Sequence, residues 1–215
     1  MALALAGVLG LTGCGGSSAV AAGGAASVSS PTSATGFRGD TLPQPVQLTS
    51  ADAAERFTST AGGTTTLGAL QHGHVMLVYY GYTHCPDVCP TTMADLGVAL
   101  RKASPSLRRK VQVVFITSDP QRDTAPVMSA WLAHFDYGLP NPFVGLTASL
   151  EQIDAVAKTM GVPLSPPVVA PNGTVTVNHG AQTLPFVDGR AALVWLASTA
   201  PDDYLHDLQK LVGQS

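Results

Sequence analysis

Apolar residues along this chain form short continuous runs that alternate with helical patterns. Two runs contain almost no polar residue, at residues 74–80 (HVMLVYY) and 111–117 (VQVVFIT). Strands covered on both faces, as in parallel sheets, have this continuous apolar character. In residues 90–103 and 124–135, apolar residues instead recur every three or four positions, which predicts one buried face of a helix. The predicted order is therefore strand, helix, strand, helix.

The chain after residue 140 continues with elements of both kinds. The predicted segments are a short strand at 143–146, a helix at 149–160, a proline-rich loop at 163–171 and a strand at 174–177. Runs at 184–187 and 191–196 are joined by Asp188-Gly189, a pair that favours a tight hairpin turn, and Pro201 opens a final helix. A βαβ unit followed by ββα predicts an α/β protein with a thioredoxin-like fold.

The region before residue 74 is less regular. Residues 39–48 and 64–67 predict short hairpin strands. Residues 15–36 contain no charged side chain and few bulky ones, which predicts a flexible tether. We therefore expect one domain from residue 37 to 215, preceded by an N-terminal extension.

The first residues form an apolar run that is too short to span a bilayer and is typical of a secretion signal. The run ends in Leu11-Thr12-Gly13-Cys14, which resembles a bacterial lipobox. This resemblance implies cleavage before Cys14 and attachment of lipid to its sulfur. The expected division is a signal peptide at 1–13, a lipid-anchored linker at 14–36 and the domain at 37–215.

Composition and net charge limit the classes of function that this chain can have. The chain has 215 residues, 45% of them hydrophobic, which suits one domain with a substantial core. Its formal net charge is −3 and only 12% of its residues are charged. No basic surface is therefore expected, and nucleic acid is excluded as a partner.

Two of the three cysteines lie in the segment GYTHCPDVCPTTM, residues 81–93, between a predicted strand and a predicted helix. The three residues between Cys85 and Cys89 allow the sulfurs to form a disulfide or to bind one metal ion. A purely structural disulfide would close so short a loop that it would stabilise the fold little. The helix N-terminus is expected to lower the thiol pKa values. Spacing alone leaves a redox pair and a metal site both open.

The segment at 81–93, together with ITSDPQRDT at 116–124, resembles the Sco/SenC family, the copper-delivering proteins of cytochrome c oxidase assembly. The resemblance extends from about residue 40 and implies a thioredoxin-like fold. It also implies one copper ion per chain, Cu(I) or Cu(II), bound by Cys85, Cys89 and a histidine late in the chain. His179, before the predicted hairpin, stands at that position. Asn178, Gly180 and Pro185 differ from the residues usual in the family.

The chemistry of this set suits copper. Thiolates are soft donors that favour Cu(I), and an imidazole extends the set to Cu(II). Asp119 and Asp123, after the second predicted strand, are candidates for orienting the site or docking a partner, and helix capping by Asp123 or Thr124 is an equally good interpretation. His84 is expected to be a spectator and is the next candidate if His179 is not a ligand. No ligand role is assigned to the other histidines: His72, His74, His134 and His206.

The resemblance implies a lipid-anchored copper chaperone on the extracytoplasmic face of a bacterial cell membrane. It would deliver copper to the dinuclear copper centre of cytochrome c oxidase, with the copper-bearing subunit as its partner and another copper chaperone or a thiol reductant as a further partner. Such a protein is a binding protein rather than an enzyme. The alternative is a thiol–disulfide oxidoreductase that uses Cys85 and Cys89 on the oxidase subunit or on other exported proteins. Copper delivery requires His179, whereas thiol exchange requires only the sulfurs.

Overall fold

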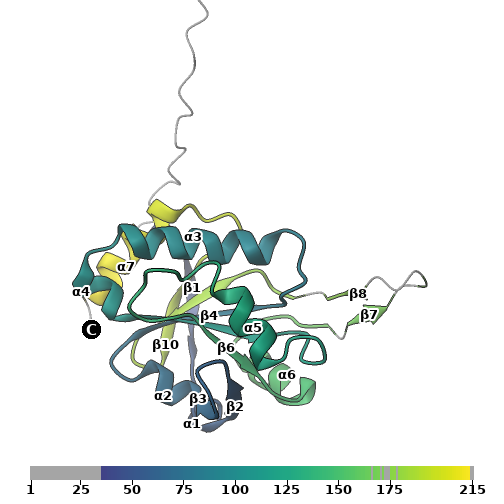
Figure 1. Ribbon diagram of the computed structural model, residues 1–215. Helices are drawn as coiled ribbons and strands as arrows, with labels where there is room; N and C mark the ends of the chain where they lie inside the picture. The colour runs from purple at the N-terminus through teal and green to yellow at the C-terminus, as the bar shows by residue number, and fades with distance from the viewer. Residues whose placement is uncertain (1–34, 166, 170, 172–174, 178, 214–215) are drawn as a thin grey trace, which may run out of the picture.

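The computed structural model describes residues 35–165, 167–169, 171, 175–177 and 179–213. A sheet lies at its centre, between layers of helices (Figure 1). This sheet has six strands in the order β3-β2-β6-β5-β4-β9. Strands β4 (Val75–Gly81), β5 (Val111–Thr117) and β6 (Val144–Thr147) are parallel to one another. Every residue of β4 and β5 is buried, as their continuous apolar sequences predict.

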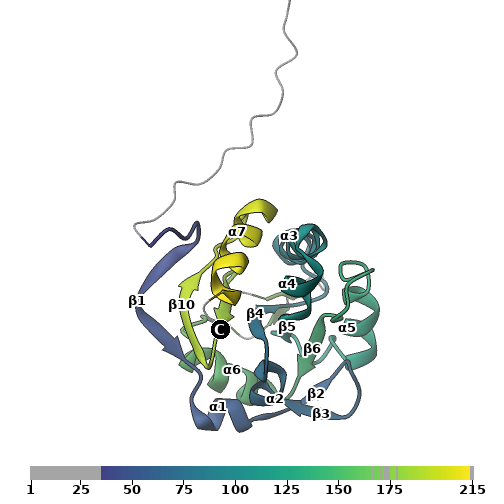
Figure 2. The same cartoon turned by 90° about the vertical axis from the view of Figure 1, so that its left-hand side faces the viewer.

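Helices cover both faces of this sheet (Figure 2). One face packs against α3 (Val88–Lys102), α5 (Ala125–Leu132) and α7 (Pro201–Val212), and the other against α2 (Leu67–Gln71) and α6 (Leu150–Thr159). Alternate residues of β4 enter the two cores, because successive side chains of a strand point to opposite faces. Leu77 and Tyr79 enter the first core, and Val78 and Tyr80 the second.

The four long predicted helices are present within about three residues of their expected bounds. Helix α3 begins at Val88, two residues before the predicted start, and α5 ends at Leu132 rather than at residue 135. In α6 the Ser149 side chain accepts a hydrogen bond from the first-turn backbone, and Gly161 follows the helix with a φ of +67°. The short helix α4 (Pro105–Arg109) was not predicted, although Ser104 caps it and proline opens it.

The predicted hairpin near the C-terminus is confirmed as β9 (Thr183–Phe186) and β10 (Arg190–Val194). Asp188 and Gly189 both have positive φ, +47° and +79°, as a tight hairpin turn of this kind requires. Apart from short elements between them, the order β4-α3-β5-α5-β6-α6-β9-β10-α7 contains the predicted βαβ unit and ends in the predicted ββα, and the fold is thioredoxin-like.

Pro185 lies within β9 without disrupting it. The N–H groups of Thr183 and Val187 donate to β10 and its extension, and Pro185 stands between them on the same side of the strand. Because proline has no N–H, the hairpin is bridged at its two ends and not at Pro185. Strand β10 instead pairs along its other edge with β1 (Asp40–Gln47).

The prediction for residues 39–48 was therefore wrong in its pairing. Strand β1 forms no local hairpin but pairs with β10, far along the chain. The strand predicted at 64–67 is β3 (Thr64–Thr66), which pairs with the unpredicted β2 (Arg56–Ser59). Helices α1 (Ser50–Ala54) and α2 were also not predicted. Short elements like these depend on distant partners more than on local sequence.

Buried Asp207 of α7 fixes the start of the domain. Its carboxylate accepts hydrogen bonds from the backbone N–H groups of Arg38 and Gly39, each at 2.9 Å, and from Trp195 Nε1 at 2.9 Å. The Arg38 side chain also pairs with Asp203 at 2.8 Å. The first residues of the domain are thus attached to its last helix.

The predicted proline-rich loop contains a two-residue strand, β7 (Val168–Val169), which pairs with β8 (Val175–Thr176). Cys14, the predicted signal peptide and most of the predicted linker lie outside the described residues, as does Asn178. Among the described helices, none has the length and apolar character needed to cross a bilayer.

Candidate metal centre

Both cysteines of the 81–93 segment lie where β4 leads into α3. Cys85 is in the connecting loop and is partly exposed, whereas Cys89 is in the first turn of α3 and fully buried. A side chain on Gly81 would come within 2.9 Å of Cys89 Sγ and within 3.0 Å of the Tyr79 and Phe115 rings. Glycine at the end of β4 therefore leaves the space in which this sulfur packs.

His179 reaches the cysteines from a segment 90 residues further along the chain. Its backbone forms an antiparallel bridge with Leu164, and Gly180 N–H donates to Pro163 O at 2.9 Å. The His179 Nδ1 atom lies 3.1 Å from Gly180 O, which can only accept, so Nδ1 carries the proton. This tautomer leaves Nε2 as a hydrogen-bond acceptor, and the Cys89 thiol donates to it at 3.3 Å.

The two sulfurs and the imidazole form one group. The ligand atoms of Cys85, Cys89 and His179 all lie within 4.8 Å of one another. Two sulfurs bound to one zinc ion, each at about 2.3 Å, lie at most about 4.6 Å apart. A small shortening of the distances between the three ligand atoms would therefore allow them to bind a single ion. The structure thus brings together the three residues that the resemblance implies as copper ligands.

The thiol pKa of Cys89 differs from the prediction. Burial raises the pKa of Cys89 to about 12, although the neighbouring Tyr82 backbone and Tyr79 side chain lower it. The expected lowering by the helix N-terminus was therefore wrong for this residue, because loss of water around the sulfur outweighs the helix dipole. A metal ion must displace the thiol proton in order to bind.

The pKa of His179 is shifted in the opposite direction. Burial lowers the pKa of its imidazole, although hydrogen bonds to backbone groups at Gly180 and Tyr80 raise it. The ring is therefore neutral at neutral pH, which is the form that binds metal. The Tyr82 and Tyr79 rings lie edge-on to the imidazole, with centroid distances of 5.6 and 6.1 Å, and fix its orientation.

Asp123 holds the loop that precedes Cys85. Its buried carboxylate accepts hydrogen bonds from Thr83 N–H at 2.9 Å, Thr83 Oγ1 at 2.5 Å and Thr117 Oγ1 at 2.7 Å. Thr124 is the N-cap residue of α5, but its side chain makes no capping hydrogen bond. Asp123 thus connects the cysteine loop to β5, and helix capping does not describe its hydrogen bonds.

Asp119 acts on the same region through Arg122. The Arg122 guanidinium pairs with Asp119 and lies 5.9 Å from the centroid of the Tyr82 ring. Tyr82 O accepts a hydrogen bond from Cys85 N–H at 3.1 Å. Asp119 therefore contacts the site only through neighbours, which is the kind of position expected for a residue that supports the loop.

His84 does not belong to the group of three. Its side chain is 54% exposed, with Nδ1 at 3.1 Å from Thr83 Oγ1 and 3.8 Å from Asp123 Oδ1. The metal-binding group found among the described residues also omits the other histidines: His72, His74, His134 and His206.

Sequence reasoning missed Tyr79 and Tyr82 as residues of the site. Both residues are buried, and each ring also contacts the imidazole of His179. The sequence gives only a positional indication, because Tyr79 lies near the end of the predicted strand and Tyr82 directly follows Gly81, before the cysteine loop.

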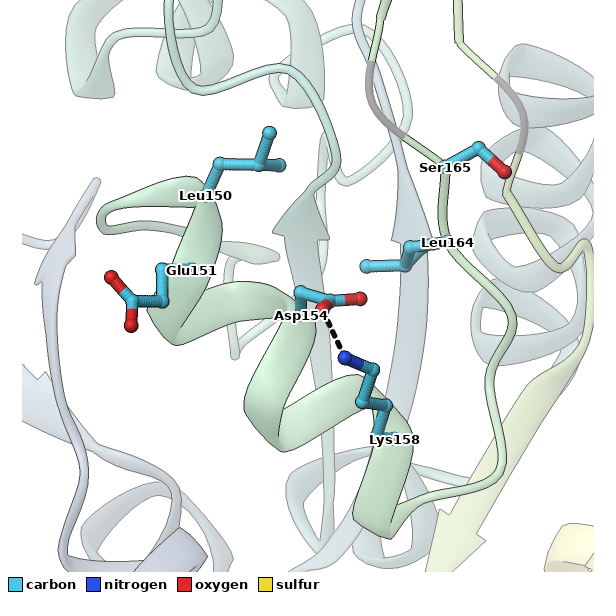
Figure 3. Close-up of a pocket in the computed structure, with 6 residues that line it drawn as sticks. All are labelled: Leu150, Glu151, Asp154, Lys158, Leu164 and Ser165. Atoms are coloured by element: carbon cyan, nitrogen blue, oxygen red, sulfur yellow. Dashed lines mark ion pairs between the residues drawn. The ribbon is translucent and has the colours of Figure 1, made fainter.

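A separate groove lies beside α6 and is shown in Figure 3. Its volume is about 380 Å³, and its lining residues are Leu150, Glu151, Asp154, Lys158, Leu164 and Ser165. Asp154 and Lys158 form an ion pair at 2.7 Å in its wall. Leu164, one of these lining residues, forms the backbone bridge with His179.

Comparison with known proteins identifies relatives of this domain. Protein SCO2, mitochondrial, from Saccharomyces cerevisiae is 33% identical over 108 residues, which cover 50% of this chain and 35% of that protein. The chain spans about half of the length, or less, of the curated relatives it matches.

Solved structures agree with this relationship. The structure of Bradyrhizobium japonicum ScoI with copper bound has a TM-score of 0.63 and 31% identity, covering 73% of this chain and 96% of that one. The apo Sco1 protein from Thermus thermophilus has a TM-score of 0.64 and 31% identity, covering 81% of this chain and 96% of that one. The family model described as SCO1/SenC matches residues 47–213, nearly the whole folded domain, and the chain belongs to this family.

Proposed function

We propose that this protein is a copper chaperone that binds one copper ion through Cys85, Cys89 and His179. The observation that carries the proposal is the convergence of these three donors within 4.8 Å. Copper is the metal suggested by the donor set, and the related ScoI structure from Bradyrhizobium japonicum contains copper. The copper ion is the cargo of such a protein rather than a permanent cofactor.

The arrangement of the three donors suits transfer of copper. Cys89 is fully buried and holds one side of the site, whereas Cys85 is partly exposed and gives a partner access to the ion. Three protein donors leave a coordination position open, so a ligand from the partner can bind before the first bond breaks. We infer that the recipient of the copper is the copper-bearing subunit of cytochrome c oxidase, at its dinuclear centre. We also infer a further partner, which is another copper chaperone that supplies the copper or a thiol reductant that keeps the two cysteines reduced.

We also infer an anchored location for the domain. The lipobox-like sequence supports a signal peptide at 1–13, lipid attachment at Cys14 and a linker at 14–36. The domain would then work on the extracytoplasmic face of a bacterial cell membrane. Radiolabelled palmitate incorporation, lost in Cys14→Ser, is the measurement that tests the anchor.

The second candidate function is thiol–disulfide exchange. It is favoured by the pairing of a partly exposed thiol with a buried one in the same group. In this reaction the Cys85 thiolate attacks a disulfide in the partner and releases one partner thiol, and Cys89 then displaces the other as a Cys85–Cys89 disulfide forms. The partner gains two electrons that this chain loses, and an external thiol reductant must restore the pair.

Copper titration of the reduced full-length protein tests the first function. We expect one equivalent of copper to bind in either oxidation state, and His179→Ala to weaken Cu(II) binding by about 100-fold or more because a third donor is lost. The matched control is His84→Ala, which should leave the affinity unchanged. Oxidation of the two thiols should remain intact in both variants. Wild-type Cu(II) affinity and spectrum in His179→Ala would contradict the assignment and direct attention to His84.

A further inference from the structure

The hydroxyl group of Tyr79 lies buried beside the metal centre without a hydrogen-bond partner. The residue is 0% exposed, and its hydroxyl bonds to no donor or acceptor in the described part of the chain. A buried hydroxyl without a partner destabilises a fold, so its retention requires an explanation. The neighbouring Tyr80 provides a contrast, because its hydroxyl lies 3.6 Å from Met160 Sδ in the other core.

The position of Tyr79 directs this hydroxyl toward the sulfur of Cys89. The Tyr79 ring edge and Cys89 Sγ both approach the same point above Gly81, at 2.8 and 2.9 Å from where its side chain would begin. Burial raises the pKa of Tyr79, and the Cys89 side chain raises it further while Thr92 lowers it. The hydroxyl therefore faces Cys89 and Thr92 and keeps its proton at physiological pH.

We propose that the Tyr79 hydroxyl is a positioning donor that hydrogen-bonds to Cys89 Sγ when this sulfur binds copper. The inference rests on the proposed copper-binding function. A protonated thiol is a weak acceptor, which agrees with the lack of a hydrogen-bond partner for the Tyr79 hydroxyl. Copper replaces the thiol proton, and the metal-bound thiolate is a stronger acceptor.

Such a hydrogen bond would influence which oxidation state of copper the site favours. Donation of a proton toward a ligating thiolate withdraws negative charge from the sulfur and so favours Cu(I) over Cu(II). Tyr79 would act through Cys89 without contacting the ion. It would stabilise Cu(I), which is the state that a two-thiolate site already prefers.

Tyr79→Phe tests this role, with Tyr80→Phe as the matched control. Both variants remove one buried hydroxyl from the same strand, but only Tyr79 faces the site. In full-length protein loaded with copper, Tyr79→Phe should shift the sulfur-to-Cu(II) absorption band. It should also raise the ratio of Cu(II) to Cu(I) affinity about tenfold, which lowers the reduction potential by about 59 mV for one electron. Tyr80→Phe should change neither quantity.

A second measurement uses the copper-free, reduced protein. Since the proposed hydrogen bond does not form without copper, Tyr79→Phe should raise Tm, by about 2–4 °C for a domain of this size. Tyr80→Phe, which removes an existing contact, should not raise it. A lower Tm for Tyr79→Phe would mean that the hydroxyl is already bonded without copper and would overturn the inference.

The outcomes separate this inference from the proposed function. If the wild-type protein and Tyr79→Phe bind copper with the same absorption band and potential, the inference fails and the copper-binding function stands. If the wild-type protein binds no copper, both fail. A shifted band and potential in Tyr79→Phe, absent from Tyr80→Phe, support both.

Discussion

The two segments that form the metal centre are held in place in different ways. The cysteine loop continues from β4, whose residues are all buried, and Asp123 attaches it to β5 through three hydrogen bonds. Among the described residues, the segment of His179 is held by a backbone bridge to Leu164 and by the Gly180 to Pro163 hydrogen bond, beside the short β7–β8 pair. The two valines of β7 are each 66% exposed.

This difference has a consequence for copper binding. Segments with few buried contacts open at a lower free-energy cost than core strands do. We expect the sulfurs to remain in position while the imidazole moves away more readily. Release of copper would then begin at His179, and the two thiolates would keep the ion until the recipient's ligands displace them.

The largest expected effect is on the pH dependence of copper affinity, because Cys89 releases a proton when copper binds and His179 does not. Because the pKa of Cys89 is raised to about 12, its thiol is protonated throughout the range from pH 7.5 to 8.5, and each proton displaced by copper makes the apparent affinity rise about tenfold per pH unit. The pKa of His179 is lowered, so its ring is already neutral and releases no proton. Copper affinities measured across this range should rise with pH equally steeply in the wild-type protein and in His179→Ala. A shallower slope in the variant would show that the imidazole carries part of the proton release.

A smaller effect is expected when the attachment of the cysteine loop is weakened. Asp123→Asn keeps the shape of the side chain but removes its charge and replaces one acceptor by a donor, which should lower the free energy of unfolding by about 1–3 kcal/mol. Urea denaturation of the reduced, copper-free protein measures this loss. The control is Asp154→Asn, which disrupts a surface ion pair with Lys158 and should cost about 0.5 kcal/mol or less. Equal losses in the two variants would contradict the anchoring role of Asp123.

The smallest effect concerns the mobility of the two segments in the absence of copper. The Thr83 amide, bonded to the buried Asp123, should exchange its hydrogen more slowly than the Gly180 amide, bonded to Pro163, by about tenfold. Amide exchange followed by NMR in reduced protein compares them directly, and addition of Cu(I) should slow exchange at Gly180 more than at Thr83. Equal protection of both amides before copper is added would remove the contrast between the segments.

The parts of this molecule that could be predicted from sequence are those with strong local patterns. Strands β4 and β5 follow from continuous apolar runs, and the hairpin turn from Asp188-Gly189. The cysteine pair could be placed between a strand and a helix because both flanking elements have strong apolar patterns. His179 was selected by family resemblance, since no pattern in the sequence links it to residues 90 positions earlier.

The features that were missed depend on contacts between distant segments. The pairing of β1 with β10 and the hydrogen bonds from Thr83 to Asp123 have no local sequence pattern. The pKa of Cys89 was predicted in the wrong direction because the helix N-terminus can be located from sequence, whereas enclosure of the sulfur by Tyr79 and Phe115 cannot. Long-range strand pairing and the pKa of a buried thiol depend on the folded environment, which local sequence does not specify.

The pairing of β1 with β10 also constrains when the domain can form during synthesis. Strand β1 is made first, but its partner is among the last segments to leave the ribosome, and β4 likewise waits for β9 to cover its second edge. Contacts between such distant segments form late and slowly. Until residues 183–194 have been synthesised, β1 has no partner strand and one edge of β4 stays unpaired, so neither pairing can form in a chain that ends before them.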